Sequence, residues 1–112
     1  MGKINNYEWV ELIPPGWAKL ATDMIEKCEA IYPKWEIIEL KEKWGTLCCT
    51  DVGTPDTVQP QIDKIIDYYE HLSIHTCNKC GRPATKISIG WILPWCDECA
   101  KERGGRYDIM GQ

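Results

Sequence analysis

Cys77-Asn-Lys-Cys80 and Cys96-Asp-Glu-Cys99, separated by fifteen residues, decide the fold of the last third of this chain. Two C-x-x-C pairs at this separation are typical of a tetrahedral zinc site, because each pair places two thiolates on one side of a tight turn. We therefore expect Cys77, Cys80, Cys96 and Cys99 to bind one Zn²⁺ ion. Reduced thiols or disulfides are the less favoured alternative.

The residues around these cysteines indicate a treble-clef-like finger more than a plain zinc ribbon. Gly81 can take the positive φ that lets the backbone curl around a metal-bound sulfur. Residues 86–89 and 91–93 are expected to form a hairpin, and residues 96–103 a short helix that stops at Gly104-Gly105. The tail after Gly105 is expected to be loose.

Four thiolates leave no open coordination position for a water or a substrate, so the expected zinc is structural and not catalytic. The sequence also lacks a Ser-His-Asp set, a Walker loop and a dinucleotide-binding glycine pattern. His71 and His75 are four residues apart, but the residues between them do not make the H-E-x-x-H motif. We expect the protein not to be an enzyme.

Before the finger, the apolar residues follow the periodicity of two helices. After Pro14-Pro15-Gly16, apolar residues at spacings of three and four indicate an amphipathic helix; they are Trp17, Leu20, Ala21, Met24, Ile25, Cys28, Ile31 and Tyr32. A second helix is expected after Asp56 or Thr57, either of which can cap it, and should end near Ser73.

Between the helices, residues 35–41 and 46–51 indicate two strands. Glu42-Lys-Trp-Gly45 is expected to join them, with Gly45 in the left-handed position of a bulged turn. The predicted fold class is therefore α+β, with two helices on a small antiparallel hairpin sheet and a C-terminal treble-clef-like or zinc-ribbon-like finger.

The length of 112 residues favours one domain, residues 1–112, with a helix-hairpin-helix body at 14–73 and a finger at 74–104. No signal peptide or membrane span is expected, which indicates a cytoplasmic protein without a membrane partner.

Cys28, Cys48 and Cys49 remain outside the metal site. We expect them to pack as small apolar side chains, with a redox pair as the alternative.

Charge is distributed unevenly along the chain. Residues 1–74 carry seven lysines and thirteen acidic side chains, a balance of −6, whereas residues 75–112 carry a balance of +2. A net charge of −4 disfavours non-specific binding to nucleic acid and favours a basic protein partner. A basic strip beside Trp44 and Trp91 that could hold single-stranded nucleic acid is the alternative, formed by Lys41, Lys43, Arg82, Lys86, Arg103 and Arg106.

Six tryptophans and no phenylalanine are unusual in a chain of this length. Trp17 and Trp35 fall on apolar patterns and are expected in the core. Trp91 and Trp95 are expected to shield the zinc.

Trp44 and Trp9 are expected to be exposed, Trp44 at the hairpin tip and Trp9 in the amino-terminal arm. Exposed tryptophan is enriched among the residues that anchor interfaces. Our candidate partner-binding residues are therefore Trp44, Lys43, Lys41 and Trp9. Packing of Trp44 back onto the sheet is the alternative.

Four segments spread over nearly the whole chain form a distinctive combination: Gly16-Trp17, Lys41-Glu-Lys-Trp-Gly-Thr-Leu47, Cys77-x-x-Cys-Gly81, and Gly90-Trp91-Ile before Cys96-Asp-x-Cys99. Together they resemble a family of short zinc-finger proteins of tailed phages and prophages. The chain departs from the family's pattern at Cys48-Cys49, where an arginine and an aromatic residue tend to follow the leucine. The family supplies no established active-site residues.

The resemblance implies a phage-derived protein in the cytoplasm of a bacterial host. We expect it to inhibit a host defence machine through protein contacts, best as an anti-CRISPR protein that blocks nucleic-acid loading of an effector nuclease. The alternative is an accessory zinc finger that binds nucleic acid directly.

Overall fold

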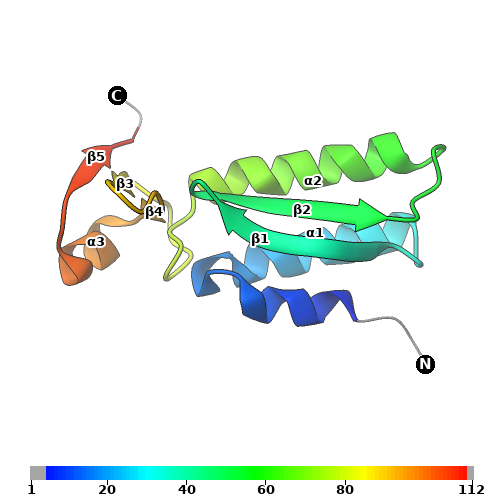
Figure 1. Cartoon of the computed structure of the whole chain (residues 1–112), viewed down its shortest axis with the longest axis horizontal. Helices are drawn as coiled ribbons and strands as arrows, with labels where there is room; N and C mark the ends of the chain where they lie inside the picture. The colour runs from blue at the N-terminus through cyan, green and yellow to red at the C-terminus, as the bar shows by residue number, and fades with distance from the viewer. Residues whose placement is uncertain (1–4, 111–112) are drawn as a thin grey trace.

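The computed structural model describes residues 5–110, which form a body and a smaller finger that lie end to end along the long axis (Figure 1). The body contains, in chain order, the 3-10 helices η1 (Asn6–Leu12) and η2 (Pro15–Trp17), helix α1 (Ala18–Ile31), strands β1 (Glu36–Lys43) and β2 (Thr46–Val52), and helix α2 (Gln59–Ile74). The finger contains strands β3 (Lys86–Ser88) and β4 (Pro94–Trp95), helix α3 (Asp97–Arg103) and strand β5 (Tyr107–Ile109). Among these residues no helix is long and apolar enough to cross a bilayer.

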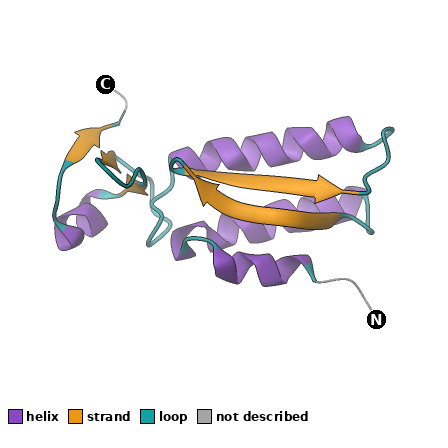
Figure 2. Ribbon diagram, in the orientation of Figure 1, coloured by secondary structure: helices purple, strands orange, loops and turns teal. Residues whose placement is uncertain are grey.

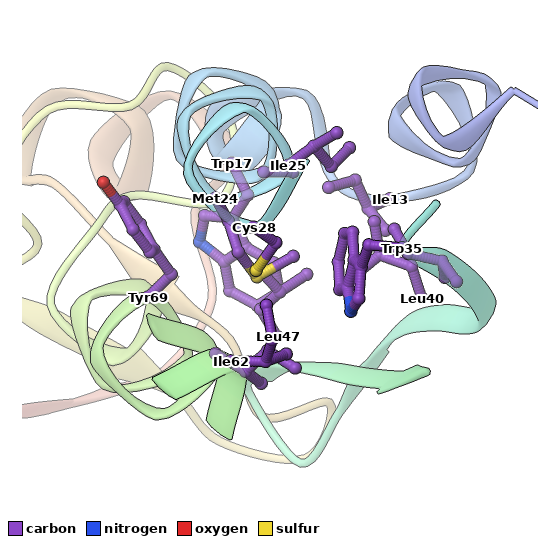
Figure 3. Close-up of a cluster of buried hydrophobic side chains, with 13 residues drawn as sticks. Ile13, Trp17, Met24, Ile25, Cys28, Trp35, Leu40, Leu47, Ile62 and Tyr69 are labelled. Atoms are coloured by element: carbon purple, nitrogen blue, oxygen red, sulfur yellow. The ribbon is translucent and has the colours of Figure 1, made fainter. Parts of the chain in front are cut away.

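The expected α+β class is confirmed, because α1 and α2 pack on the antiparallel hairpin β1–β2 (Figure 2). The core of the body lies between these layers, and the side chains in Figure 3 converge on it from both helices and both strands. Trp17 and Trp35 are both completely buried there, as predicted. Burying a large apolar side chain stabilises a fold by about 1.5–3 kcal/mol, so this cluster is the main source of stability in the body.

The hairpin differs from the prediction at its tip. Lys43 pairs with Thr46, and both Trp44 and Gly45 have positive φ, 55° and 82°. These are the features of a tight two-residue turn of the I′ kind, not of a bulged turn. The extra residue lies instead at Ile38, where the register of β1 shifts and lets both Ile37 and Leu40 face the core.

Side chains from neighbouring helices cover both outer edges of this two-stranded sheet. On β1, Asn6 of η1 accepts a hydrogen bond from the Ile37 N–H (2.9 Å) and donates one to the Trp35 carbonyl (2.8 Å). On β2, Ser73 Oγ accepts from the Leu47 N–H and Glu70 Oε2 accepts from the Cys49 N–H, both at 2.8 Å. Three backbone N–H groups of the hairpin, those of Ile37, Leu47 and Cys49, are therefore not available to pair another strand.

The start of α2 also differs from the prediction. The N–H groups of Val58 and Gln59 both donate to the Pro55 carbonyl, so residues 55–58 form a turn that leads into the helix. Val58 is the N-cap and makes no side-chain hydrogen bond to the helix. Asp56 and Thr57, the expected caps, lie within that turn.

The finger is longer than its sequence predicts. Its sheet has the order β4-β3-β5, and the tail expected to be loose supplies β5, which pairs with β3 from Lys86 to Ser88. The second strand of the predicted hairpin lies at Pro94–Trp95, not at residues 91–93. Residues 89–93 form a loop instead, because the buried Ser88 hydroxyl donates to the Trp91 carbonyl and accepts from the Leu93 N–H.

Candidate metal centre and hairpin-tip surface

The four predicted cysteines converge at one point in the finger. Their Sγ atoms all lie within 4.8 Å of one another, and those of Cys80 and Cys96 are 3.5 Å apart. Four sulfurs bound to one zinc ion at about 2.3 Å would be roughly 3.8 Å apart, so the cluster has the size of a tetrahedral site. Among residues 5–110 this is the only group of three or more His, Cys, Asp or Glu side chains placed to hold a metal ion.

Local backbone structure explains how each C-x-x-C pair is held. Cys96 is the N-cap of α3, and its Sγ accepts a hydrogen bond from the Cys99 N–H at 3.4 Å. In the first pair, Gly81 takes a φ of 86° as predicted, and the next N–H, that of Arg82, donates to Cys80 Sγ at 3.5 Å. Such N–H groups stabilise negative charge on a sulfur.

The pKa values of the clustered cysteine thiols fit a site for a cation. Burial raises the pKa of Cys77, but the backbone N–H groups of Cys80, Cys96 and Lys79 outweigh burial and lower it to about 7. Burial and hydrogen bonding with the other sulfurs raise the pKa of Cys99 to about 12. Four thiolates this close repel one another, so a divalent cation with a preference for sulfur would displace the remaining protons. The residues present therefore fit a structural metal ion.

Trp95 covers this site, whereas Trp91 does not. Trp95 packs against Cys77, Cys96 and Cys99 in a small second core, and the Arg103 guanidinium lies 5.1 Å from the centre of its ring. Trp91 is 70 % exposed in the loop 89–93, because Ser88 ties that loop back on itself and turns the indole outward. The prediction that Trp91 shields the metal is wrong.

Gly16 and Trp17 join the body to the first cysteine pair. The Gly16 N–H donates to the Asn78 carbonyl at 2.8 Å, and the Trp17 indole N–H donates to the Thr76 carbonyl at 3.0 Å. A Cβ added at Gly16 would lie only 2.0 Å from the Cys77 carbonyl oxygen. The apolar pattern places these residues at the start of a helix, but no local pattern signals a contact with residues about sixty positions away.

Of the four candidate partner-binding residues, three are exposed and Trp9 is half-buried. Trp44 is 76 % exposed at the hairpin tip, so it does not pack back onto the sheet. Trp9, expected in an exposed arm, is half-buried in η1 against the body core, because η1 folds along β1. Lys43 is exposed beside Trp44, and exposed Lys41 pairs with Glu39 on its own strand (3.3 Å).

The predicted basic strip forms only in part as free cations. Lys43 and Arg106 are exposed and make no ion pair among the described residues, whereas other members of the strip are engaged. Arg82 pairs with Glu98 (2.8 Å), Lys86 pairs with Asp97 (2.7 Å), and Arg103 stacks on Trp95. Each of these cations is engaged by a neighbour in the finger, although Arg82 and Arg103 remain exposed. The exposed positive charge along this side is therefore smaller than the sequence predicts.

Trp91 and Ile92 lie beside Trp44. The sequence suggested that Trp44 and Trp91 are neighbours only as part of the basic strip of the nucleic-acid alternative. The finger loop reaches the hairpin tip, where Ile92 Cγ2 lies 3.1 Å from the position of a Cβ added at Gly45. A hollow of about 280 Å³ opens there, lined by Glu42, Lys43, Trp44, Gly90, Trp91 and Ile92. We call this the Trp44–Trp91 surface. The one sequence signal for it is that both tryptophans adjoin a turn glycine.

The three remaining cysteines lie in the body. Burial raises the pKa of Cys28 to about 12 and also raises the pKa of Cys48 and of Cys49. These thiols stay protonated at neutral pH and are poor nucleophiles. Cys28 and Cys49 pack in or against the body core as small apolar side chains.

No protein-family model, curated protein or solved structure matches this chain. The resemblance to phage zinc-finger proteins therefore rests on its motif residues alone.

Proposed function

We propose that Cys77, Cys80, Cys96 and Cys99 bind one structural Zn²⁺ ion, which fixes the finger against the body. Zinc is the metal that four thiolates in tetrahedral array usually hold in small domains. The support is the convergence of the four Sγ atoms. With all four positions taken by protein, such an ion has no place for a substrate, which supports a binding module and not an enzyme.

The binding role is proposed for the Trp44–Trp91 surface, and the observation that carries it is the backbone of Trp44. Among the described residues, Trp44 is the only one other than glycine with a positive φ. A bulky residue in this conformation is strained, and asparagine or glycine would satisfy the turn at lower cost. Strain of this kind is retained where the side chain is needed. The indole is 76 % exposed, so the need is for a partner outside the chain.

Within this class, we propose that the protein is a phage-derived inhibitor that acts in the cytoplasm of a bacterial host, best as an anti-CRISPR protein. The acidic body, with a balance of −6 over residues 1–74, is complementary to the basic surface on which an effector nuclease loads nucleic acid. Complementary charge speeds the encounter, and a central aromatic anchor slows dissociation. Direct binding of nucleic acid is the alternative, which the ion pairs of Arg82 and Lys86 within the finger disfavour.

The test is target-DNA cleavage by purified CRISPR effector nucleases of several types, with the protein added before the guide RNA or before the target. The matched variant is Trp44→Asn, because asparagine tolerates the left-handed turn and keeps the hairpin. We expect the natural protein to inhibit one effector class, and Trp44→Asn to need roughly tenfold more protein while it keeps its metal and melts at the same or a higher temperature.

Electrophoresis with single-stranded DNA and RNA at low salt separates the two functions. If the protein inhibits no effector and retards nucleic acid with a steep salt dependence, the inhibitor proposal is rejected in favour of the accessory finger.

A further inference from the structure

The Trp44–Trp91 surface has the chemistry of a site for a positively charged side chain. Its hollow of about 280 Å³ has two largely exposed indoles, Trp44 and Trp91, and one carboxylate, that of Glu42, in its lining. Indole faces attract cations through the negative potential of the ring, and tryptophan does so more strongly than the other aromatic residues. Few side chains other than an arginine or lysine would use both indoles and the carboxylate.

The two walls of the hollow are held in place before any ligand arrives. On one side, Glu42 Oε2 accepts a hydrogen bond from the Gly45 N–H at 2.8 Å, which fixes the turn that carries Trp44. On the other side, Ser88 binds both the Trp91 carbonyl and the Leu93 N–H, which fixes the loop that carries Trp91. Preorganised walls reduce the entropy lost on binding.

We propose that this hollow binds an arginine side chain on a basic partner protein. The inference rests on the proposed protein-binding function and specifies the chemistry of its anchor. A guanidinium is planar, stacks on aromatic faces and donates hydrogen bonds to a carboxylate. Within residues 5–110, Glu42 has no ion-pair partner, and its second oxygen makes no hydrogen bond, so that oxygen can accept from the guanidinium.

Charge around the surface favours a cationic side chain over a nucleobase with its phosphate. The finger cations Arg82 and Lys86 form ion pairs with Glu98 and Asp97. They therefore do not add a row of free positive charges that could bind phosphates next to the surface. The opposing charge is Lys43, which lines the hollow and has no ion-pair partner among the described residues. Lys43 would repel an arginine and attract a phosphate, so the effect of removing it has opposite signs for the two ligands.

The experiment follows the tryptophan indole N–H signals by ¹⁵N NMR while a capped Gly-Gly-Arg-Gly-Gly peptide is added to the full-length, metal-loaded protein. We expect the Trp44 and Trp91 signals to shift, with a Kd on the order of millimolar for a single side chain. The buried Trp17 and Trp35 indoles are internal controls and should not shift. Signals are assigned with Trp44→Asn and Trp91→Ala.

Three comparisons decide the proposal. The same peptide with neutral citrulline in place of arginine should bind at least about threefold more weakly, as should the arginine peptide with Glu42→Gln. Lys43→Gln should bind the arginine peptide about twofold or more tightly. A short oligothymidylate is the competing probe.

The proposal is overturned if citrulline binds as well as arginine, if Lys43→Gln weakens peptide binding, or if only the oligothymidylate shifts the two indoles. These outcomes differ from failure of the proposed function. If the protein inhibits an effector in a Trp44-dependent way but does not bind the arginine peptide, the arginine proposal is rejected and the inhibitor proposal stands.

Discussion

Gly16 is the residue on which the junction between body and finger depends. Its backbone N–H binds the Asn78 carbonyl, and its Cα lies so close to the first cysteine pair that no side chain fits. The contact joins two residues, Gly16 and Asn78, that are far apart in the sequence. It places the first cysteine pair directly against the residues that lead into α1.

Gly16→Ala should therefore destabilise the protein by about 2–3 kcal/mol and weaken its hold on the metal, because the backbone must move to accept the methyl group. Thermal unfolding of the metal-loaded protein measures the first effect, and competition with a zinc-binding dye measures the second. Gly53→Ala is the matched control: its φ is positive, but open space surrounds its Cα, so the expected loss is only about 1 kcal/mol. Equal losses for the two variants would contradict the close contact.

The four cysteines could be predicted from the sequence because the spacing within each pair is local and the chemistry of thiolates is specific. Trp91 could not be placed in the same way. The hydrogen bonds of Ser88 set the path of the loop, and this path decides whether the Trp91 side chain faces the cysteines or solvent. No residue type in the sequence signals that path. Trp9 was misplaced for a related reason, since η1 has no periodic pattern in the sequence.

At the scale of elements, α2 is fastened to β2 by side chains that reach backbone N–H groups. Ser73 is completely buried, and its hydroxyl accepts from Leu47 while it donates to the Glu70 carbonyl (2.5 Å). Glu70 accepts from Cys49 one pleat further along the strand. Burial raises the pKa of Glu70, the Cys49 N–H partly offsets this, and nearby Asp67 adds to it.

Ser73→Ala should lower the free energy of unfolding by about 1–3 kcal/mol, because it leaves the buried Leu47 N–H without a partner. Chemical denaturation with urea provides the measurement. Thr57→Ala is a useful comparison, since Thr57 is exposed in the turn before α2 and caps nothing. It should change stability by less than about 0.5 kcal/mol. If Thr57→Ala lowered the free energy of unfolding by about 1 kcal/mol, Thr57 would be the helix cap that the sequence suggested.

Helices α1 and α2 and the hairpin were predictable because their apolar periodicity extends over several turns or pleats. Strand β5 was not, because its three residues carry no pattern of their own and form a strand only by pairing with β3. The same holds for β4, whose two residues include a proline. Such short strands are defined by their pairing with another strand and not by a pattern of their own.

For the molecule as a whole, metal binding should depend on pH. Burial and hydrogen bonding raise the pKa of Cys99 to about 12, and the pKa of Cys80 is also raised, so at least these two sulfurs carry protons at pH 7 before the ion binds. Both protons must leave, so lower pH favours release of the metal. We expect the apparent affinity for zinc to rise by at least about a hundredfold per pH unit between pH 6 and 8, measured by competition with a chelator of known affinity. An affinity independent of pH would contradict the thiolate site.

Removal of the ion should also affect the body. The finger sheet and the contacts of Gly16 and Trp17 depend on the first cysteine pair, so a chelator should lower the melting temperature of the whole chain. Hydrogen exchange would then rise first in residues 76–109 and next around residues 14–18. Exchange confined to the finger, with an unchanged body, would show that the two parts are independent.

The central claim is that one zinc ion, held by four thiolates, fixes the finger and through it the surface that carries Trp44 and Trp91. X-ray absorption at the zinc edge of the purified protein, with metal quantified on the same sample, tests it most directly. We predict one zinc per chain with four sulfur neighbours at about 2.3 Å, and loss of most of the zinc in Cys80→Ser. No zinc, or a zinc with nitrogen or oxygen neighbours in the first coordination sphere, would contradict the account.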